Sequence, residues 1–320
     1  YRKKKRTFFR KDLNMKGMNF LLLALSCLLV TAFAACTSVD EPVSEPFVPI
    51  GFSPAMNDAN TRYASDDLPA TMGVFAYLTE GGGFNASAST PNFMYNQLVT
   101  RNGTAWSYTP VKYWPTNTND KVSFFAYAPH NASGLTPCAN TQKGYPFLTY
   151  TVAQAEKDQT DLLATAPFAD KNAGDVNFTL RHALTKVTLK VKSGDKYVKE
   201  ITSLSINAAT SGELHFKDGG FEWKNVTGNY GYPPATTTDL KFAATDRERE
   251  IATFFLLPTA TVTATYSIAY TVKTTTGTDV LTRTFSALPL SSAPLWTAGA
   301  HIVYTINLSE RTATVTAGVT

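Results

Sequence analysis

The chain has 320 residues, of which 43% are hydrophobic and 17% are charged. This apolar content is enough for a sizeable core and excludes a disordered chain. The formal net charge of +4 arises in residues 1–35, which carry eight Lys/Arg and one Asp, while the other residues hold 21 basic and 24 acidic side chains. We predict no nucleic-acid partner, because no basic stripe remains outside those 35 residues.

The N-terminal residues have the features of a bacterial export signal. An apolar run over residues 20–33 is as long as a signal-peptide core and short for a membrane span. Small residues separate this run from Cys36, as a lipoprotein signal peptidase requires. We therefore expect residues 1–35 to be a lipoprotein signal peptide, started at Met15 or Met18, and Cys36 to be lipidated. The alternative is a plain secretory signal cut near Ala35, with Cys36 incidental.

The segment that follows the signal indicates a tether and then a first strand. Residues 36–46 are polar and contain two prolines, which is typical of a spacer. In residues 47–52 the apolar side chains Val48, Ile50 and Phe52 alternate, so we expect them to share one face of a short edge strand.

Short strands bounded by turn residues fill the rest of the chain. Aromatic residues make up 12% of the sequence and, with Val and Thr, favour strands. One helical segment is expected at residues 153–166. The pattern predicts an all-β protein with two β-sandwich domains, 47–194 and 195–320, divided near Gly194. The expected strands are 72–78, 93–99, 106–114, 121–128, 176–182, 184–191, 201–206, 214–216, 221–223, 251–257, 266–272, 281–285, 301–308 and 312–320.

The sequence predicts no catalytic site, metal site or cofactor. It has neither a nucleophile elbow nor a phosphate-binding loop, and Cys138 has no histidine beside it. We expect the strand histidines to be bonded to neighbouring backbone and the protein not to be an enzyme. Two interpretations stay open for an aromatic cluster, as a platform for a sugar or as core: Trp106, Tyr108, Tyr113 and Trp114.

Several stretches, in order along the chain, resemble the fimbrillin (Mfa-like) family of type V pilus subunits. Each stretch alone is weakly specific, and their order and spacing carry the resemblance. Besides Cys36 they are Ile50–Phe52, Thr61–Arg62, Met72–Ala76, Lys112–Pro115, Val122–Pro129, Asp161–Ala166, Phe178–Val187 and Trp296–Ile306.

The resemblance implies two transthyretin-like β-sandwiches and a mechanism of assembly. The subunit would reach the outer membrane as a lipoprotein, and an arginine-specific protease would cut after Arg62. The first strand, with Val48, Ile50 and Phe52, would then leave a groove for a strand of another subunit. The candidate donor strand lies at residues 312–320, with its apolar side chains at Ala313, Val315, Ala317 and Val319.

The expected function is therefore a structural or adhesive subunit of a cell-surface fimbrium. Its partners would be other fimbrial subunits, a host or bacterial surface ligand, and the outer membrane through the lipid anchor. A stalk subunit and a tip or anchor subunit are both open. Two further hypotheses are a non-polymerising surface lipoprotein that binds glycans and a lipid-anchored hydrolase, which would need converging carboxylates or a histidine-centred site in a cleft.

Overall fold

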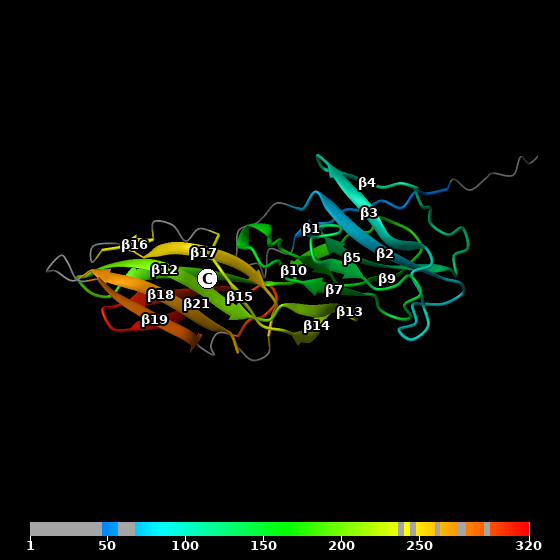
Figure 1. The fold of residues 1–320 in the computed structure, drawn as a ribbon. Coiled ribbons are helices and arrows are strands. Elements are labelled where there is room, and N and C mark those ends of the chain that lie inside the picture. The colour runs from blue at the N-terminus through cyan, green and yellow to red at the C-terminus, as the bar shows by residue number, and fades with distance from the viewer. Residues whose placement is uncertain are drawn as a thin grey trace, which may run out of the picture. The chain divides into compact units, whose positions relative to one another are not determined.

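The structure is a computed structural model and describes residues 47–56, 68–235, 240–243, 248–259, 263–273, 280–290 and 295–319. Within these ranges the chain is built almost wholly from strands, which confirms the predicted all-β class (Figure 1). The one helix in them is a single 3₁₀ turn, η2 (Glu156–Asp158). No helical segment of the described residues is both long and apolar enough to cross a membrane.

Two sheets form a first sandwich. The larger sheet is antiparallel apart from one parallel pair, β1 with β10, and the smaller sheet is wholly antiparallel. In spatial order the larger sheet contains β1 (Ala55–Met56), β10 (Thr179–His182), β8 (Leu163–Thr165), β5 (Lys121–Ala128), β2 (Thr71–Thr79), β3 (Met94–Asn102) and β4 (Ala105–Ser107), with β9 (Phe168–Lys171) also paired to β5. The smaller sheet contains β14 (Gly220–Thr227), β13 (Ser211–Lys217), β7 (Phe147–Thr151) and β6 (Leu135–Pro137).

The central strands of the larger sheet are buried on both faces. On β5, Phe125 belongs to the core shared with the smaller sheet and lies 5.7 Å from the ring of Phe216 on β13. Its neighbour Phe124 points to the other face, into a second core that also holds Ile50 and Phe52. Two-sided burial explains why β5 is a continuous apolar run rather than an alternating strand. The first segment of the chain therefore covers the outer face of this sheet.

A second pair of sheets uses the remaining strands. One contains β17 (Arg249–Leu256), β11 (Thr185–Ser193), β20 (His301–Leu308) and β21 (Ala313–Val319), with β11 and β20 parallel. The other contains β15 (Tyr230–Tyr232), β12 (Val198–Ala208), β18 (Thr265–Lys273) and β19 (Val280–Pro289), with β16 (Lys241–Phe242) paired to β12. The strand predicted at residues 266–272 is confirmed as β18, in which the side chains of Tyr266, Ile268, Tyr270 and Val272 are all buried on one face.

Strand pairing crosses the predicted boundary at Gly194 in both directions. β11 precedes Gly194 and pairs with β17 and β20. β13 follows Gly194 and pairs with β7, beside which it lies in Figure 1. Sheet membership thus differs from the predicted ranges 47–194 and 195–320. The reason is that a turn marks where a strand ends but does not specify which distant strand it pairs with. Whether the two sandwiches are separate domains stays a prediction.

The helix predicted at residues 153–166 is wrong, because tertiary contacts use these residues differently. Glu156 Oε1 accepts a hydrogen bond from the Thr253 backbone nitrogen at 2.8 Å, and Gln159 Oε1 accepts one from the Phe255 nitrogen at 2.9 Å. Both side chains thereby satisfy backbone donors of β17, and residues 163–165 form β8. A weak local propensity for helix yields to such pairing.

The strand predicted at 106–114 is also shorter in the structure. The named strand of that region, β4, ends at Ser107, and Pro110 separates it from residues 112–114, which form an isolated bridge with residues 48–50. Proline has no backbone N–H to donate to a ladder, so the alternating pattern does not continue as a strand.

The pairing of β11 predicts how fragments behave. A fragment of residues 195–320 lacks β11, whose side chains Val187, Leu189 and Val191 are fully buried. Because β17 and β20 then lose their shared partner, we expect this fragment to show no cooperative thermal unfolding by circular dichroism. A fragment of residues 183–320 keeps β11 and should unfold cooperatively. Equal cooperative unfolding of both fragments would contradict this role of β11.

Candidate functional site

Residues 47–56 lie between two stretches of the first sandwich that are far away in sequence. On one side the segment pairs with residues 112–114, through Ile50 N to Lys112 O at 2.9 Å and Trp114 N to Val48 O at 3.0 Å. On the other side it runs parallel to residues 176–180, with hydrogen bonds that include Val176 N to Gly51 O at 3.0 Å. We call residues 47–56 the first segment, because they are the first that the structure describes. The first segment is therefore inserted between two backbone edges.

Two of its three predicted core side chains fill the outer core. Ile50 is 2% exposed and Phe52 is 6% exposed, whereas Val48 is 54% exposed. Val48 is therefore not part of the outer core. The reason is that pairing with residues 176–180 begins at Gly51, so Val48 lies ahead of the part of the segment that is covered on both sides.

Aromatic rings surround Phe52. Its ring is stacked on Phe178 at a centroid distance of 5.7 Å and lies 5.2 Å from Tyr108 and 6.0 Å from Phe124. Trp114 packs edge-on against Phe124 at 5.7 Å and donates its indole N–H to Gly174 O at 3.1 Å. We use the name Phe52 groove for the place that the Phe52 ring occupies and the four aromatic residues that line it: Tyr108, Trp114, Phe124 and Phe178.

The sequence left open whether the aromatic cluster at residues 106–114 is a platform for a sugar or part of the core, and the structure answers this for some of its members. Trp114 is buried and Tyr108 donates its hydroxyl to Ile50 O at 2.9 Å, so both belong to the packing around the first segment. Trp106 is partly buried beside the same core. Tyr113 is exposed and pairs with the ring of Phe47 at 5.8 Å. Apolar walls flanked by backbone edges are the features that bind an extended strand.

Two predicted sites lie outside the described residues. Arg62 is in the undescribed stretch of residues 57–67, six residues beyond the end of β1, and Cys36 precedes Phe47. Cleavage after Arg62 and lipidation of Cys36 therefore stay predictions.

The candidate donor strand forms β21, at the edge of its sheet. It pairs with β20 in antiparallel register from Leu308 opposite Ala313 to Ile302 opposite Val319. Ala313, Val315 and Ala317 pack partly against the core, while Val319 is 40% exposed. The strand is thus paired within its own sandwich and contributes small side chains to it.

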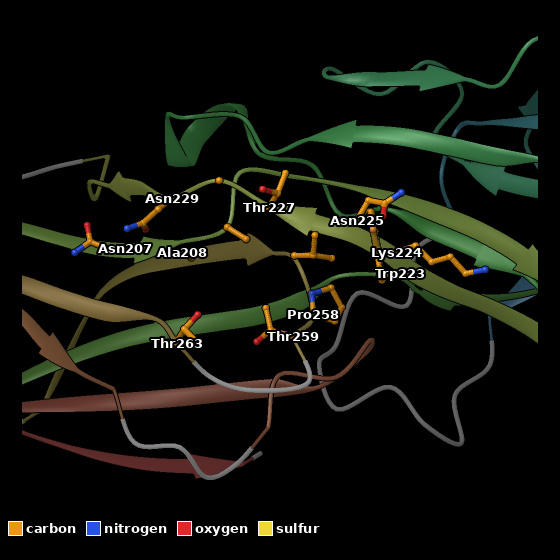
Figure 2. Close-up of a pocket in the computed structure, with 13 residues that line it drawn as sticks. Asn207, Ala208, Trp223, Lys224, Asn225, Thr227, Asn229, Pro258, Thr259 and Thr263 are labelled. Carbon is orange, nitrogen blue, oxygen red and sulfur yellow. The ribbon is translucent and has the colours of Figure 1, made fainter.

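A pocket of about 560 Å³ lies where β12, β14 and the connection between β17 and β18 approach one another. Figure 2 shows Asn225, Thr227 and Asn229 on one side of it and Pro258 and Thr259 on the other. Among its lining residues, Lys224 alone carries a charge. The volume falls within the range of sites for small ligands, and the lining offers amide and hydroxyl groups.

The indole of Trp223, also in the lining of this pocket, is held in place. Its N–H donates to Ala183 O at 2.7 Å, and a Cβ added at Gly212 would lie 3.2 Å from its Cε3 atom, so glycine leaves room for the ring. The next residue but one, Asn225, has φ of 52° beside a β-bulge of β14. No sequence motif predicts this pocket, because its residues come from three separate segments.

Each of the four histidines has a polar partner, and the partners named here for the strand residues His182 and His301 are side chains of other segments rather than the neighbouring backbone that we expected. His301 Nε2 lies 2.9 Å from Thr188 Oγ1, His130 Nε2 lies 3.2 Å from Asn96 O, and His182 contacts Asp161. His215 Nε2 lies 2.8 Å from Glu213 Oε2, a pair that the sequence interpretation missed although the residues are two apart. In the described parts of the chain no group of three or more His, Cys, Asp or Glu side chains could hold a metal ion.

The fold and its inserted first segment define a class of protein: a two-sandwich β-protein whose outer core is completed by a single strand. The family model described as fimbrillin-like matches residues 61–320, so the chain belongs to the fimbrillin-like family. This confirms the resemblance drawn from the sequence motifs.

Two individual proteins illustrate the similarity. The fimbrium subunit Fim1C of Phocaeicola vulgatus is 35% identical over 141 residues, which are 38% of this chain and 37% of that protein. The match therefore spans less than half the length of this curated relative. The crystal structure of a fimbrial protein from Bacteroides vulgatus superposes with a TM-score of 0.58 at 22% identity, covering 85% of this chain and 98% of the other, and supports the fold.

Truncating Phe52 tests the groove. Phe52→Ala should lower the free energy of unfolding by about 3–5 kcal/mol, because a buried ring leaves a cavity among three aromatic neighbours. Val48→Ala, in the same segment but mostly exposed, should change it by less than about 0.5 kcal/mol. Chemical denaturation of the two variants measures both values. Similar effects at the two positions would mean that Phe52 does not anchor the segment.

Proposed function

We propose that this chain is a structural or adhesive fimbrial subunit that assembles by strand exchange at the Phe52 groove. The observation that carries the proposal is the insertion of residues 47–56 between two backbone edges. In this proposal the chain is exported as a lipoprotein through Cys36, is cut after Arg62 at the cell surface, and loses its first segment. A strand of another subunit then occupies the groove.

The hydrogen bonds and buried side chains that keep the first segment in place support this proposal. Five backbone hydrogen bonds of 2.8–3.0 Å join it to its neighbours, and Ile50 and Phe52 bury almost all of their surface. Burial of such a side chain contributes about 1.5–3 kcal/mol. Removing the segment would therefore leave apolar walls and unpaired backbone groups, and an incoming strand would regain both contributions.

The side chains that fill the Phe52 groove are larger than those that β21 would donate. The groove is filled by an isoleucine and a phenylalanine, whereas β21 offers alanine and valine at its alternate positions. A strand with such small side chains would leave cavities in the Phe52 groove, and cavities are destabilising. We therefore propose that the subunit that fills this groove supplies bulkier side chains than β21 does.

Mild trypsin treatment of the purified full chain tests the cleavage step. We expect a cut after Arg62, release of the first segment, and conversion to SDS-resistant oligomers once a donor subunit is added. Mass spectrometry, size-exclusion chromatography and gel electrophoresis follow the three events.

The matched variants are Arg62→Ala, which should block the conversion, and Arg101→Ala, which should not affect it. A clean cut that leaves a stable monomer in the presence of the donor would count against strand exchange. An uncut parent chain would count against Arg62 as the maturation site.

A second candidate function is binding of a neutral saccharide, and the pocket beside Trp223 favours it. Its lining combines a fixed indole with asparagine and threonine side chains, and Lys224 is the sole charged member. Aromatic surface and uncharged hydrogen-bonding groups suit a ligand that has apolar faces and many hydroxyls. This function is compatible with adhesion by an assembled subunit and with a surface lipoprotein that does not polymerise.

Titration with a panel of neutral oligosaccharides tests the second candidate. We expect Asn229→Ala and Thr227→Ala to weaken binding about tenfold each, as the loss of one hydrogen bond to a ligand would. Asn172→Ala, a surface asparagine of the first sandwich, is the matched control. Binding that is absent from the parent chain, or equally strong in all three variants, would remove this candidate.

A further inference from the structure

The turn between β20 and β21 is closed by its own first and last residues. Ser309 N donates to Thr312 O at 2.8 Å, and Thr312 N donates to Ser309 Oγ at 2.9 Å. The two hydroxyl oxygens lie 2.7 Å apart. These bonds give the turn a fixed shape before any contact with the rest of the sandwich is considered.

Side chains from outside the turn bind its backbone. From β18, the Tyr270 hydroxyl lies 2.8 Å from Ser309 O and 3.0 Å from Thr312 O, and the Tyr266 hydroxyl donates to Ala313 O at 3.1 Å. From β19, Arg283 Nε donates to Glu310 O at 2.7 Å. Both strands belong to the sheet opposite β21, so these bonds tie the turn across the sandwich.

The fourth side chain that binds this turn, Asp195, lies in the connection between β11 and β12. Glu310 N donates to Asp195 Oδ2 at 2.5 Å. We call the four side chains that hold this turn the turn clasp: Asp195, Tyr266, Tyr270 and Arg283.

Asp195 is itself held by a buried cation. The Lys199 side chain is fully buried, contacts Asp195 Oδ1, and donates to Ser193 Oγ at 3.0 Å. Burial alone would raise the pKa of Asp195, but the bonds from Lys199 and from the backbone nitrogens of Tyr197 and Glu310 lower it below its usual value. The carboxylate is therefore charged at neutral pH, and a hydrogen bond to a charged acceptor is stronger than one to a neutral acceptor.

The body of β21 is held much less firmly than its turn. Its apolar side chains are small and only partly buried, while its partner β20 buries Ile302, Tyr304, Ile306 and Leu308 completely. As an edge strand, β21 has a ladder on one side only. The side-chain hydrogen bonds described above, which tie this part of the chain to the opposite sheet and to Asp195, all fall at residues 309–313, while Val315 and Ala317 add apolar packing along the strand.

We propose that the turn clasp is a latch that keeps β21 in its own sandwich and that its opening governs release of this strand to another subunit. The inference rests on the proposed strand exchange and adds a control point to it. Peeling the exposed end of β21 from β20 breaks ladder bonds one by one, but the strand cannot move away as a whole while the opposite sheet holds its turn.

Hydrogen exchange of the purified full chain tests the latch without any assembly. Tyr270→Phe keeps the ring and removes the hydroxyl, and Asp195→Asn removes the charge that receives Glu310 N. We expect each variant to speed exchange of peptides that cover residues 309–319 about tenfold, as the loss of one or two hydrogen bonds would. Tyr232→Phe is the matched control, because the Tyr232 hydroxyl donates to Ala209 O at 3.0 Å in the same sandwich but far from the turn in sequence.

The outcomes separate the latch from the proposed function. Faster exchange confined to residues 309–319 in the two clasp variants, together with faster donation of β21 to a trypsin-treated acceptor subunit, would support the latch. The latch is overturned if Tyr270→Phe changes exchange no more than Tyr232→Phe, if exchange rises across the whole sandwich, or if donation keeps the parent rate. A parent chain that never donates β21, although its clasp variants exchange faster, would overturn the latch as a control of donation and leave the clasp as a structural restraint; strand exchange at the Phe52 groove, which calls for a donor with bulkier side chains than β21, is tested separately by the trypsin experiment.

Discussion

The stacking of Phe52 on Phe178 closes the outer face of the largest sheet, and the first sandwich depends on it. Strands β2 and β5 are apolar on both faces, so one of those faces would meet water if nothing covered it. The cover is a ten-residue segment that inserts Ile50 and Phe52 among aromatic walls. Together with Trp114, Val176, Phe178 and Leu180, this segment completes the core on the outer face of the sheet.

Different interactions hold the first segment of the described chain, residues 47–56, and its last strand, β21. Residues 47–56 are held by large buried side chains and by backbone pairing on both sides, an arrangement that resists spontaneous release. β21 is held by one ladder, small side chains and polar contacts to its turn. The polar contacts to the turn can be replaced one by one by hydrogen bonds to water, whereas release of a buried aromatic ring exposes its whole apolar surface. This contrast favours an irreversible step, such as proteolysis, for the first strand and a reversible step for the last.

Much of the strand pattern could be predicted because its cause is local. The alternating burial at residues 187–191 and 266–272 follows from a pleated backbone with one buried face. The turn between the expected strands 214–216 and 221–223 follows from the conformational freedom of glycine, with φ of 74° at Gly219. The family could be predicted from motifs in order along the chain. The position of Ile50 and Phe52 in the core also follows from alternation, while Val48 is exposed because cover from residues 176–180 begins after it.

The sequence did not predict which strands pair or which distant side chains form hydrogen bonds. Nothing near Ser211–Lys217 specifies β7 as its neighbour, and nothing near Asp195 specifies Glu310, which is 115 residues away. The expected helix at 153–166 failed for the same reason, since its polar side chains satisfy backbone groups of β17. The sequence by itself determined where strands lie and which face of each is apolar, because both depend on neighbouring residues. Only the tertiary structure decided which strands pair, what covers the outer core and what holds the final turn, because those depend on side chains that meet only after the chain has folded.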